Sequence, residues 1–212
     1  MITVIGSLKG GSGKSTVTFN LAVWLSMAGE NVLAIDVDPQ ATLSDVAEVR
    51  TEEGYDPNIT VKTKPSLQLE AFEGFGEVLI DIGTADIESM KKAIELADRI
   101  VVPVPPSQAD IWSTQRFIRF VESVRGRDNL PDIMGFVNRA DTHRAVRESD
   151  EAAAALVSLP GIEFLKPRLC QRTVFRRSFS EGLAVFELDP RSKGTREWNS
   201  LVSLLYPELV SG

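Results

Sequence analysis

The stretch that most constrains this chain covers residues 10–16 and reads Gly-Gly-Ser-Gly-Lys-Ser-Thr. It follows a short β-branched run at residues 2–6 and leads into a helical pattern at residues 15–29. Glycines allow successive backbone N–H groups to turn inward, and the first turn of a helix adds N–H groups that lack partners. Strand, glycine loop and helix in this order predict a binding site for nucleotide phosphates.

The individual residues of this loop predict how a nucleotide is held. Lys14 is expected to neutralise the β- and γ-phosphates, Ser15 to ligate Mg²⁺ through its hydroxyl, and Thr16 to reach the α-phosphate. The backbone expected to surround the phosphates belongs to Gly10, Gly11, Ser12 and Gly13. A nucleotide with Mg²⁺ is therefore the expected ligand of this loop.

The rest of the chain alternates short apolar runs with longer helical patterns. Candidate strands lie at residues 2–6, 31–37, 77–83, 99–104, 133–138 and 162–165. Candidate helices lie at residues 15–29, 86–97, 109–125, 143–158 and 194–206. Apolar strands that alternate with helices predict an α/β fold, with a doubly wound, mainly parallel sheet and helices on both faces.

Two further features bear on the organisation of the domain. Residues 44–75 have the weakest pattern, and we expect a short helix and two weak strands there. No linker or low-complexity tract divides the chain, so residues 1–212 are expected to form a single domain.

The phosphate loop departs from the general pattern G-x-x-x-x-G-K-[ST]. Leu8 stands where the first glycine belongs, and the loop instead reads K-G-G-x-G-K-[ST], with Lys9 at its head. This version resembles the deviant Walker ATPases of the ParA/MinD family. The stretch at residues 164–198 resembles the end of the short ParA proteins of plasmids. The resemblance implies that Lys9 reaches across a dimer interface to the partner's ATP and shares a catalytic role with Lys14. A solvent-exposed lysine beside the loop is the alternative interpretation.

Three further motifs support the same resemblance. In D-x-D-P-Q after the second candidate strand, the family pattern implies that Asp36 supports Mg²⁺ and that Asp38 positions the attacking water. Asp81 ends an apolar run, where the family has an aspartate that holds a water on Mg²⁺. The residues after Asp81 differ from the D-x-P-P that the family often has. Asn138 and Arg139 resemble the pair that contacts adenine.

The charge of the chain is unevenly distributed. The formal net charge is −7, yet residues 101–212 carry 15 Lys and Arg against 14 Asp and Glu. No acid lies between Glu163 and Glu181, and a basic stretch on an acidic protein points to a polyanion such as DNA. A solvated helix face is the alternative. The candidate DNA contacts are Arg168, Arg172, Arg176, Arg177 and Lys193, with Arg191 and Arg196 as additional candidates.

Other branches of the superfamily need features that this sequence lacks. Iron-protein reductases need paired cysteines, whereas Cys170 is the single cysteine and reads as a half-buried apolar residue. Membrane-bound members end in a basic amphipathic helix, but the residues after Arg196 carry almost no positive charge, so no membrane partner is expected. His143 reads as a surface residue at a helix start rather than a ligand.

We therefore expect a cytoplasmic, nucleoid-associated ATPase that acts in DNA partition. ATP and Mg²⁺ would produce a homodimer that binds DNA without sequence preference, and a centromere-binding adaptor protein would stimulate hydrolysis and release. Two alternatives remain open. One is an ATPase that positions a protein cargo over the nucleoid, and the other is an ATP-dependent cofactor-biosynthetic ligase, which has little use for Lys9 or the basic stretch.

Overall fold

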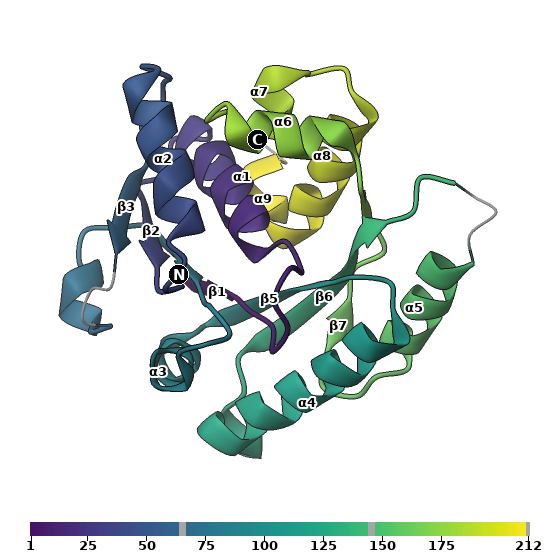
Figure 1. The fold of residues 1–212 in the computed structure, drawn as a ribbon. Helices are drawn as coiled ribbons and strands as arrows, with labels where there is room; N and C mark the ends of the chain where they lie inside the picture. The colour runs from purple at the N-terminus through teal and green to yellow at the C-terminus, as the bar shows by residue number, and fades with distance from the viewer. Residues whose placement is uncertain (64–66, 144–146, 211–212) are drawn as a thin grey trace.

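The computed structural model describes residues 1–63, 67–143 and 147–210, and its centre is a parallel β-sheet (Figure 1). The strands run in the order β3-β2-β4-β1-β5-β6-β7, and β8 pairs with β6. Their bounds are β1 Ile2–Ile5, β2 Val32–Asp36, β3 Thr60–Thr63, β4 Glu77–Asp81, β5 Arg99–Val104, β6 Asp132–Ala140, β7 Glu163–Phe164 and β8 Leu169–Cys170. All the described pairings are parallel, as the apolar strands predicted.

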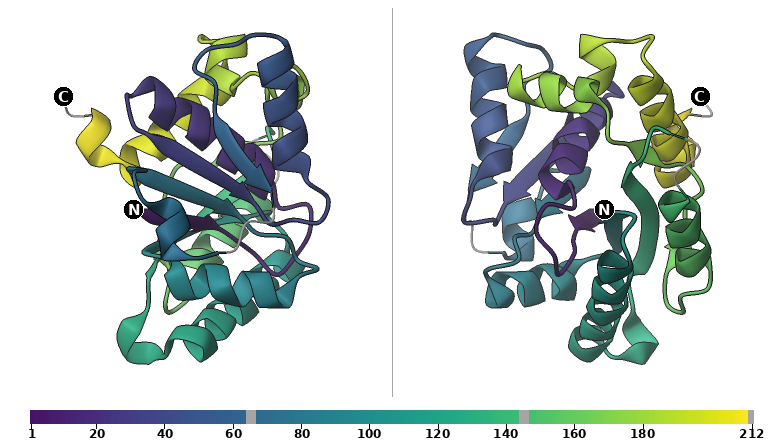
Figure 2. Two further views of the ribbon diagram at one scale, coloured as in Figure 1. Left: turned by 90° about the vertical axis from the view of Figure 1, so that its left-hand side faces the viewer. Right: turned by 45° about the vertical axis from the view of Figure 1, so that its right-hand side comes forward.

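Helices cover both faces of the sheet (Figures 1 and 2). One layer contains α1 Lys14–Met27, α2 Thr42–Glu52, α6 Thr173–Ser180, α7 Val185–Leu188, α8 Lys193–Leu205 and α9 Pro207–Val210. The other layer contains α3 Ile87–Leu96, α4 Gln108–Arg125 and α5 Glu148–Val157. In β2, Ala34 belongs to the first hydrophobic core, and Leu33 and Ile35 belong to the second. Because successive residues of a strand point to opposite faces, burial on both sides requires strands that are apolar throughout.

The winding direction of the chain reverses at β1. From β1 the chain passes to β2 and β3 on one side, returns to β4 next to β1, and then continues through β5 and β6 on the other side. In open α/β sheets, ligands bind outside the carboxyl ends of the strands at this point of reversal. The loop that follows β1, which is the predicted phosphate loop, therefore lies at the expected ligand crevice.

The expected elements are found with small shifts at their ends, and the fold class is confirmed. The helix expected at residues 143–158 is α5, which begins at Glu148; residues 144–146 of that expectation lie outside the described residues. The stretch 44–75 contains most of α2, then β3, and after β3 the 3₁₀ turn η1 Leu69–Phe72, which stands in place of the second expected strand among the described residues. Elements that sequence analysis missed are short: β8, α6, α7, α9 and the 3₁₀ turn η2 Arg127–Asn129.

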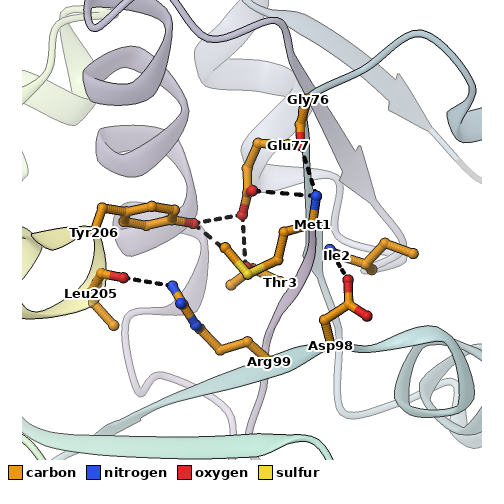
Figure 3. Close-up of polar contacts among 9 residues, drawn as sticks. All are labelled: Met1, Ile2, Thr3, Gly76, Glu77, Asp98, Arg99, Leu205 and Tyr206. Carbon is orange, nitrogen blue, oxygen red and sulfur yellow. Dashed lines mark hydrogen bonds and ion pairs between the residues drawn. The ribbon is translucent and has the colours of Figure 1, made fainter. Parts of the chain in front are cut away.

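A buried polar cluster joins the end of α8 to the centre of the sheet, away from the phosphate loop (Figure 3). Tyr206 donates a hydrogen bond of 2.6 Å to Oε1 of Glu77 in β4, and the Thr3 hydroxyl in β1 donates to the same oxygen at 2.8 Å. The Arg99 guanidinium lies 5.1 Å from the centroid of the Tyr206 ring and donates to the Leu205 carbonyl at 2.7 Å. Burial raises the pKa of Glu77, although both hydrogen bonds oppose this rise.

Candidate nucleotide-binding site

The loop between β1 and α1 is held in shape by its own serines and glycines. The Ser7 hydroxyl donates to the Lys9 carbonyl at 2.9 Å and lies 3.0 Å from the Ser12 hydroxyl. Gly11 and Gly13 have φ angles of +74° and +92°, which residues with a Cβ rarely adopt. Gly13 is also the N-cap of α1, so the loop ends where unpaired N–H groups and the helix dipole favour a phosphate.

Lys14, the first residue of α1, is a buried cation. Burial lowers the pKa of its ammonium group, while the negative charges of Asp81 and Asp38 raise it. A buried charge needs compensation, and a bound phosphate would supply it next to Lys14. Ser15 and Thr16 line the same hollow as Lys14, as the sequence predicted for a phosphate site.

This nucleotide hollow has a volume of about 490 Å³, which is within the usual range for small-molecule sites. One part of its wall is the phosphate loop with the start of α1, and another is the segment that follows β2. The opposite wall, which sequence analysis did not assign to a nucleotide, comes from residues 169–180 and α8. Its apolar side chains are Leu169, Phe175, Phe179 and Trp198. No short motif marks this wall, because α6 and α8 are brought to the loop only by packing.

The two aspartates of the D-x-D-P-Q motif have different surroundings. Asp36 is 1% exposed, and its Oδ1 accepts from the Asp38 backbone N–H at 3.1 Å. Its Oδ2 accepts from both the backbone N–H and the hydroxyl of Ser44, each at 2.9 Å. Asp36 therefore fixes the turn between β2 and α2. Asp38 lines the hollow, and its Oδ1 accepts from the Gln40 backbone N–H at 3.0 Å; its role toward the attacking water stays a prediction.

Asp81, at the carboxyl end of β4, is 1% exposed, and neither of its carboxylate oxygens has a hydrogen-bond partner among the described residues. Burial raises the pKa of Asp81 to about 7. The Ser15 hydroxyl, which approaches without hydrogen-bonding geometry, and Lys14 oppose this rise, while the charges of Asp36 and Asp38 add to it. A buried carboxylate without partners fits a hydrated cation, because the water on the cation would donate to it.

The residues present fit a nucleotide with Mg²⁺ rather than a metal bound by protein alone. Among the described residues, no group of three or more His, Cys, Asp or Glu side chains is arranged to hold a metal ion. Mg²⁺ is normally bound through few protein ligands together with substrate phosphates and water. The Ser15 hydroxyl and the orphaned oxygens of Asp81 are of this kind.

Gly83 accounts for the departure from D-x-P-P after Asp81. A Cβ at Gly83 would lie 2.8 Å from Cγ and 3.0 Å from Cα of Asp38. These distances are shorter than ordinary van der Waals contact, so the backbone after β4 can pass Asp38 only where no side chain intervenes. Gly83 therefore leaves the space that Asp38 occupies next to the hollow.

Asn138 and Arg139 lie at the phosphate loop in the structure. The Asn138 side-chain amide donates to the Ser12 carbonyl at 2.6 Å, and the Arg139 guanidinium donates to the Gly11 carbonyl. Arg139 also has a φ angle of +56°, an uncommon conformation for a residue with a side chain. Both residues line the nucleotide hollow, and their role toward adenine stays a prediction. Their contacts in the structure brace the loop.

Lys9 is paired with a residue that sequence analysis missed. Its ammonium nitrogen lies 3.0 Å from Oδ1 of Asp110, near the start of α4. Asp110 belongs to the pattern Ser-x-x-Asp, which is typical of a helix N-terminus. This pattern predicts a helix cap and does not predict an ion pair with Lys9, which lies 101 positions earlier. Lys9 is thus a solvent-exposed lysine that is paired within its own chain, and its role toward a partner's ATP stays a prediction.

The five candidate DNA contacts have unequal surroundings. Arg168 pairs with Asp150 at 2.8 Å, and Arg177 pairs with Glu181 at 3.2 Å, all on exposed side chains. Arg172 is the N-cap of α6 and binds Glu197 at 2.6 Å with 23% of its side chain exposed. Arg176 and Lys193 are exposed.

These surroundings rank the candidates. Arg172 is the least available to DNA, because its guanidinium is committed to Glu197, which also accepts from the Cys170 backbone N–H. Exposed pairs such as Arg168 with Asp150 are weak and can exchange for a phosphate. Arg176 and Lys193 are the most available. All five assignments stay predictions.

Fold and site together define a class of protein: a nucleotide-binding domain with a phosphate loop. The model of the CbiA family, described as the CobQ/CobB/MinD/ParA nucleotide binding domain, matches residues 3–185. The chain therefore belongs to this family, and the resemblance to ParA/MinD proteins is confirmed.

Comparisons over almost the whole chain agree. The maintenance of carboxysome distribution protein A of Halothiobacillus neapolitanus is 26% identical over 210 residues, 96% of this chain and 95% of that protein. A plasmid partition protein from Borrelia burgdorferi, solved with AMPPNP, has a TM-score of 0.76 and 18% identity, with 98% of each chain covered. Apo McdA of Cyanothece has a TM-score of 0.77 and 21% identity, covering 96% of this chain and 98% of that one. At these identities the two structures establish the shared fold.

One structural finding bears on membranes. None of the helices in the described part of the chain is long and apolar enough to cross a bilayer.

Proposed function

We propose that this protein is an ATPase whose ATP-bound dimer binds DNA without sequence preference, and that ATP hydrolysis releases it. The observation that carries the proposal is the arrangement at the carboxyl ends of the strands. Buried Lys14 lines one hollow, with Asp38 at its wall and exposed Arg176 at its rim. The orphaned Asp81 carboxylate lies behind this hollow, close enough to Lys14 and Ser15 to interact with both.

The residues of the hollow would divide the work of hydrolysis. Lys14 and the loop N–H groups bind and orient the phosphates, and Ser15 holds the cation with Asp81 behind it. Asp38, held by Gln40 and given room by Gly83, orients the attacking water. Bound Mg²⁺ would supply positive charge to the phosphate oxygens as negative charge develops there.

DNA binding would come from phosphate contacts and would therefore weaken steeply with salt. Dimerisation brings two sets of basic residues together, so a nucleotide that controls the dimer also controls DNA affinity. We place Arg176 and Lys193 first among the contacts because both are exposed. Hydrolysis in a single chain would be slow, and an adaptor protein that adds a positive charge would stimulate it.

The cargo has two candidates. One is DNA partition, which the plasmid partition protein from Borrelia burgdorferi supports by its fold. The other is the positioning of a protein assembly, supported by the relative from Halothiobacillus neapolitanus, whose name refers to carboxysome distribution. Loss of plasmids after deletion of the gene would favour the first, whereas clustering of a labelled protein assembly with stable plasmids would favour the second.

The experiment that tests the proposal measures binding to a random-sequence DNA duplex with ATP–Mg²⁺, with ADP–Mg²⁺ and without nucleotide, across a salt series. We expect tight, salt-sensitive binding with ATP–Mg²⁺ alone, and its loss in Lys9→Ala. The logarithm of DNA affinity falls linearly with the logarithm of salt concentration, and Arg176→Ala should reduce this slope by about one per chain. The control is Arg116→Ala, at an exposed arginine on α4, which should leave the slope unchanged. Absence of DNA binding in every state, with turnover that depends on a small molecule, would instead support a ligase.

A further inference from the structure

The ion pair between Lys9 and Asp110 combines a fixed carboxylate with an accessible lysine. The two charged atoms are 3.0 Å apart, and the exposed fractions of the side chains are 47% for Lys9 and 8% for Asp110. The pair lies in a second, open hollow of about 680 Å³, next to the nucleotide hollow. Its rim also carries two acids, Asp141 and Glu148, and two arginines, Arg139 and Arg176.

Asp110 is held in place by its own helix. Its backbone N–H donates to the Ser107 hydroxyl at 3.2 Å, and that hydroxyl donates in turn to Oδ2 of Asp110. Ser107 is the N-cap of α4, so the carboxylate lies in the first helical turn, where the helix dipole favours negative charge. The remaining oxygen, Oδ1, contacts Lys9.

Apart from its pair with Asp110, Lys9 is anchored through its backbone. Its carbonyl accepts from Ser7 inside the phosphate loop, whereas half of its side chain is exposed. The side chain can therefore turn away from Asp110 without a change in the loop.

We propose that Asp110 is a positioning residue that holds Lys9 within its own chain, and that the dimer forms only when ATP in the partner draws Lys9 away. This inference rests on the proposed ATP-bound dimer. The triphosphate carries several negative charges against the single charge of Asp110, so it can displace the carboxylate, whereas a nucleotide that lacks the terminal phosphate competes less well. Asp110 thereby favours dimerisation in the ATP-bound state over the ADP-bound state.

The size of the effect follows from the exposure of the pair. An ion pair with one half-exposed member favours the paired over the separated state by about two- to fivefold. Both chains must release Lys9, so this factor enters twice, and Asp110→Asn is expected to tighten the ATP-bound dimer about tenfold.

The first readout uses the single chain without nucleotide and therefore does not depend on the proposed function. Lys9 and Lys91 are matched lysines with exposed side-chain fractions of 47% and 43%, paired with Asp110 and Glu88 at 3.0 Å each. Acylation by an N-hydroxysuccinimide ester, quantified by mass spectrometry, should rise severalfold at Lys9 in Asp110→Asn and at Lys91 in Glu88→Gln. Neither substitution should change labelling of the other lysine.

The second readout is the dissociation constant of the dimer with ATP–Mg²⁺ and with ADP–Mg²⁺, measured by analytical ultracentrifugation. We expect Asp110→Asn to lower the dissociation constant of the dimer with ATP–Mg²⁺ about tenfold and to allow some dimer to form with ADP–Mg²⁺. Glu88→Gln should have the same dissociation constants as wild type. Unchanged Lys9 labelling, or a dimer no tighter than wild type, would overturn the role of Asp110 while the proposed function stands. A wild-type protein that stays monomeric with ATP–Mg²⁺ would overturn both.

Discussion

The side-chain amide of Asn138 donates a 2.6 Å hydrogen bond to the carbonyl of Ser12, which lies 126 residues earlier, inside the phosphate loop. Asn138 is 6% exposed and packs so closely that a Cβ at Gly13 would collide with it. The end of β6 thus holds the loop in shape before any nucleotide binds.

Asn138→Ala should weaken ATP binding about tenfold, because the buried Ser12 carbonyl loses its partner and the loop is no longer preorganised. Calorimetric titration of ATP–Mg²⁺ measures the effect. The matched control is Asn31→Ala, which also removes a 2.6 Å bond to a distant carbonyl, that of Gly74, but on an exposed surface. Equal affinities for wild type and Asn138→Ala would show that the loop keeps its shape without this bond.

Gly83→Ala should reduce ATP hydrolysis at least about tenfold while leaving ATP binding within about twofold of wild type. The added Cβ would lie 2.8 Å from Cγ of Asp38 and must displace it, and a small displacement of the group proposed to position the attacking water would be costly. Single-turnover hydrolysis and nucleotide titration on the same sample separate the two quantities. Normal hydrolysis in this variant would contradict the role given to Asp38.

Glu187→Gln should destabilise the protein by about 3 kcal/mol, because it leaves the buried Arg50 charge without its partner. Arg50 is fully buried and binds both oxygens of Glu187, at 2.8 and 2.9 Å, so that α2 is joined to α7. Urea unfolding measures the loss. Glu181→Gln is the control, since its pair with Arg177 is exposed and should contribute little.

Glu77→Gln should flatten the pH dependence of stability. The pKa of Glu77 is raised above its ordinary value of 4.5 in the folded state, so folding favours its protonated form. The contribution of protonated Glu77 to stability is present in full below about pH 4.5, and it is lost as the pH rises through the raised pKa of Glu77 in the folded state. Glutamine keeps the acceptor for Tyr206 and Thr3 without the buried charge.

The measurement is the free energy of unfolding of both proteins from pH 4 to pH 8, a range that begins below the ordinary pKa of a glutamate. The difference between variant and wild type should shift in favour of the variant as the pH rises. A constant difference over this range would mean that Glu77 does not titrate there.

The phosphate loop and the fold class could be predicted from sequence because both depend on local pattern. The left-handed Gly11 and Gly13 and the helix that begins at Lys14 are encoded within one short stretch. The central strands β2, β4 and β5 are largely apolar because they are covered on both faces. The weak region 44–75 was less predictable, since β3 is largely exposed and carries little hydrophobic signal.

Sequence alone therefore determined that this chain binds a nucleotide on a parallel sheet, and it singled out Lys9, Asp38 and Asp81 by their place in motifs. Only the tertiary structure decided what these side chains contact. The pairing of Lys9 with Asp110, the brace from Asn138 to Ser12 and the commitment of Arg172 to Glu197 join residues distant in the chain. Such contacts form when helices and strands pack, and the local pattern of residue types in the sequence does not indicate which surfaces will meet.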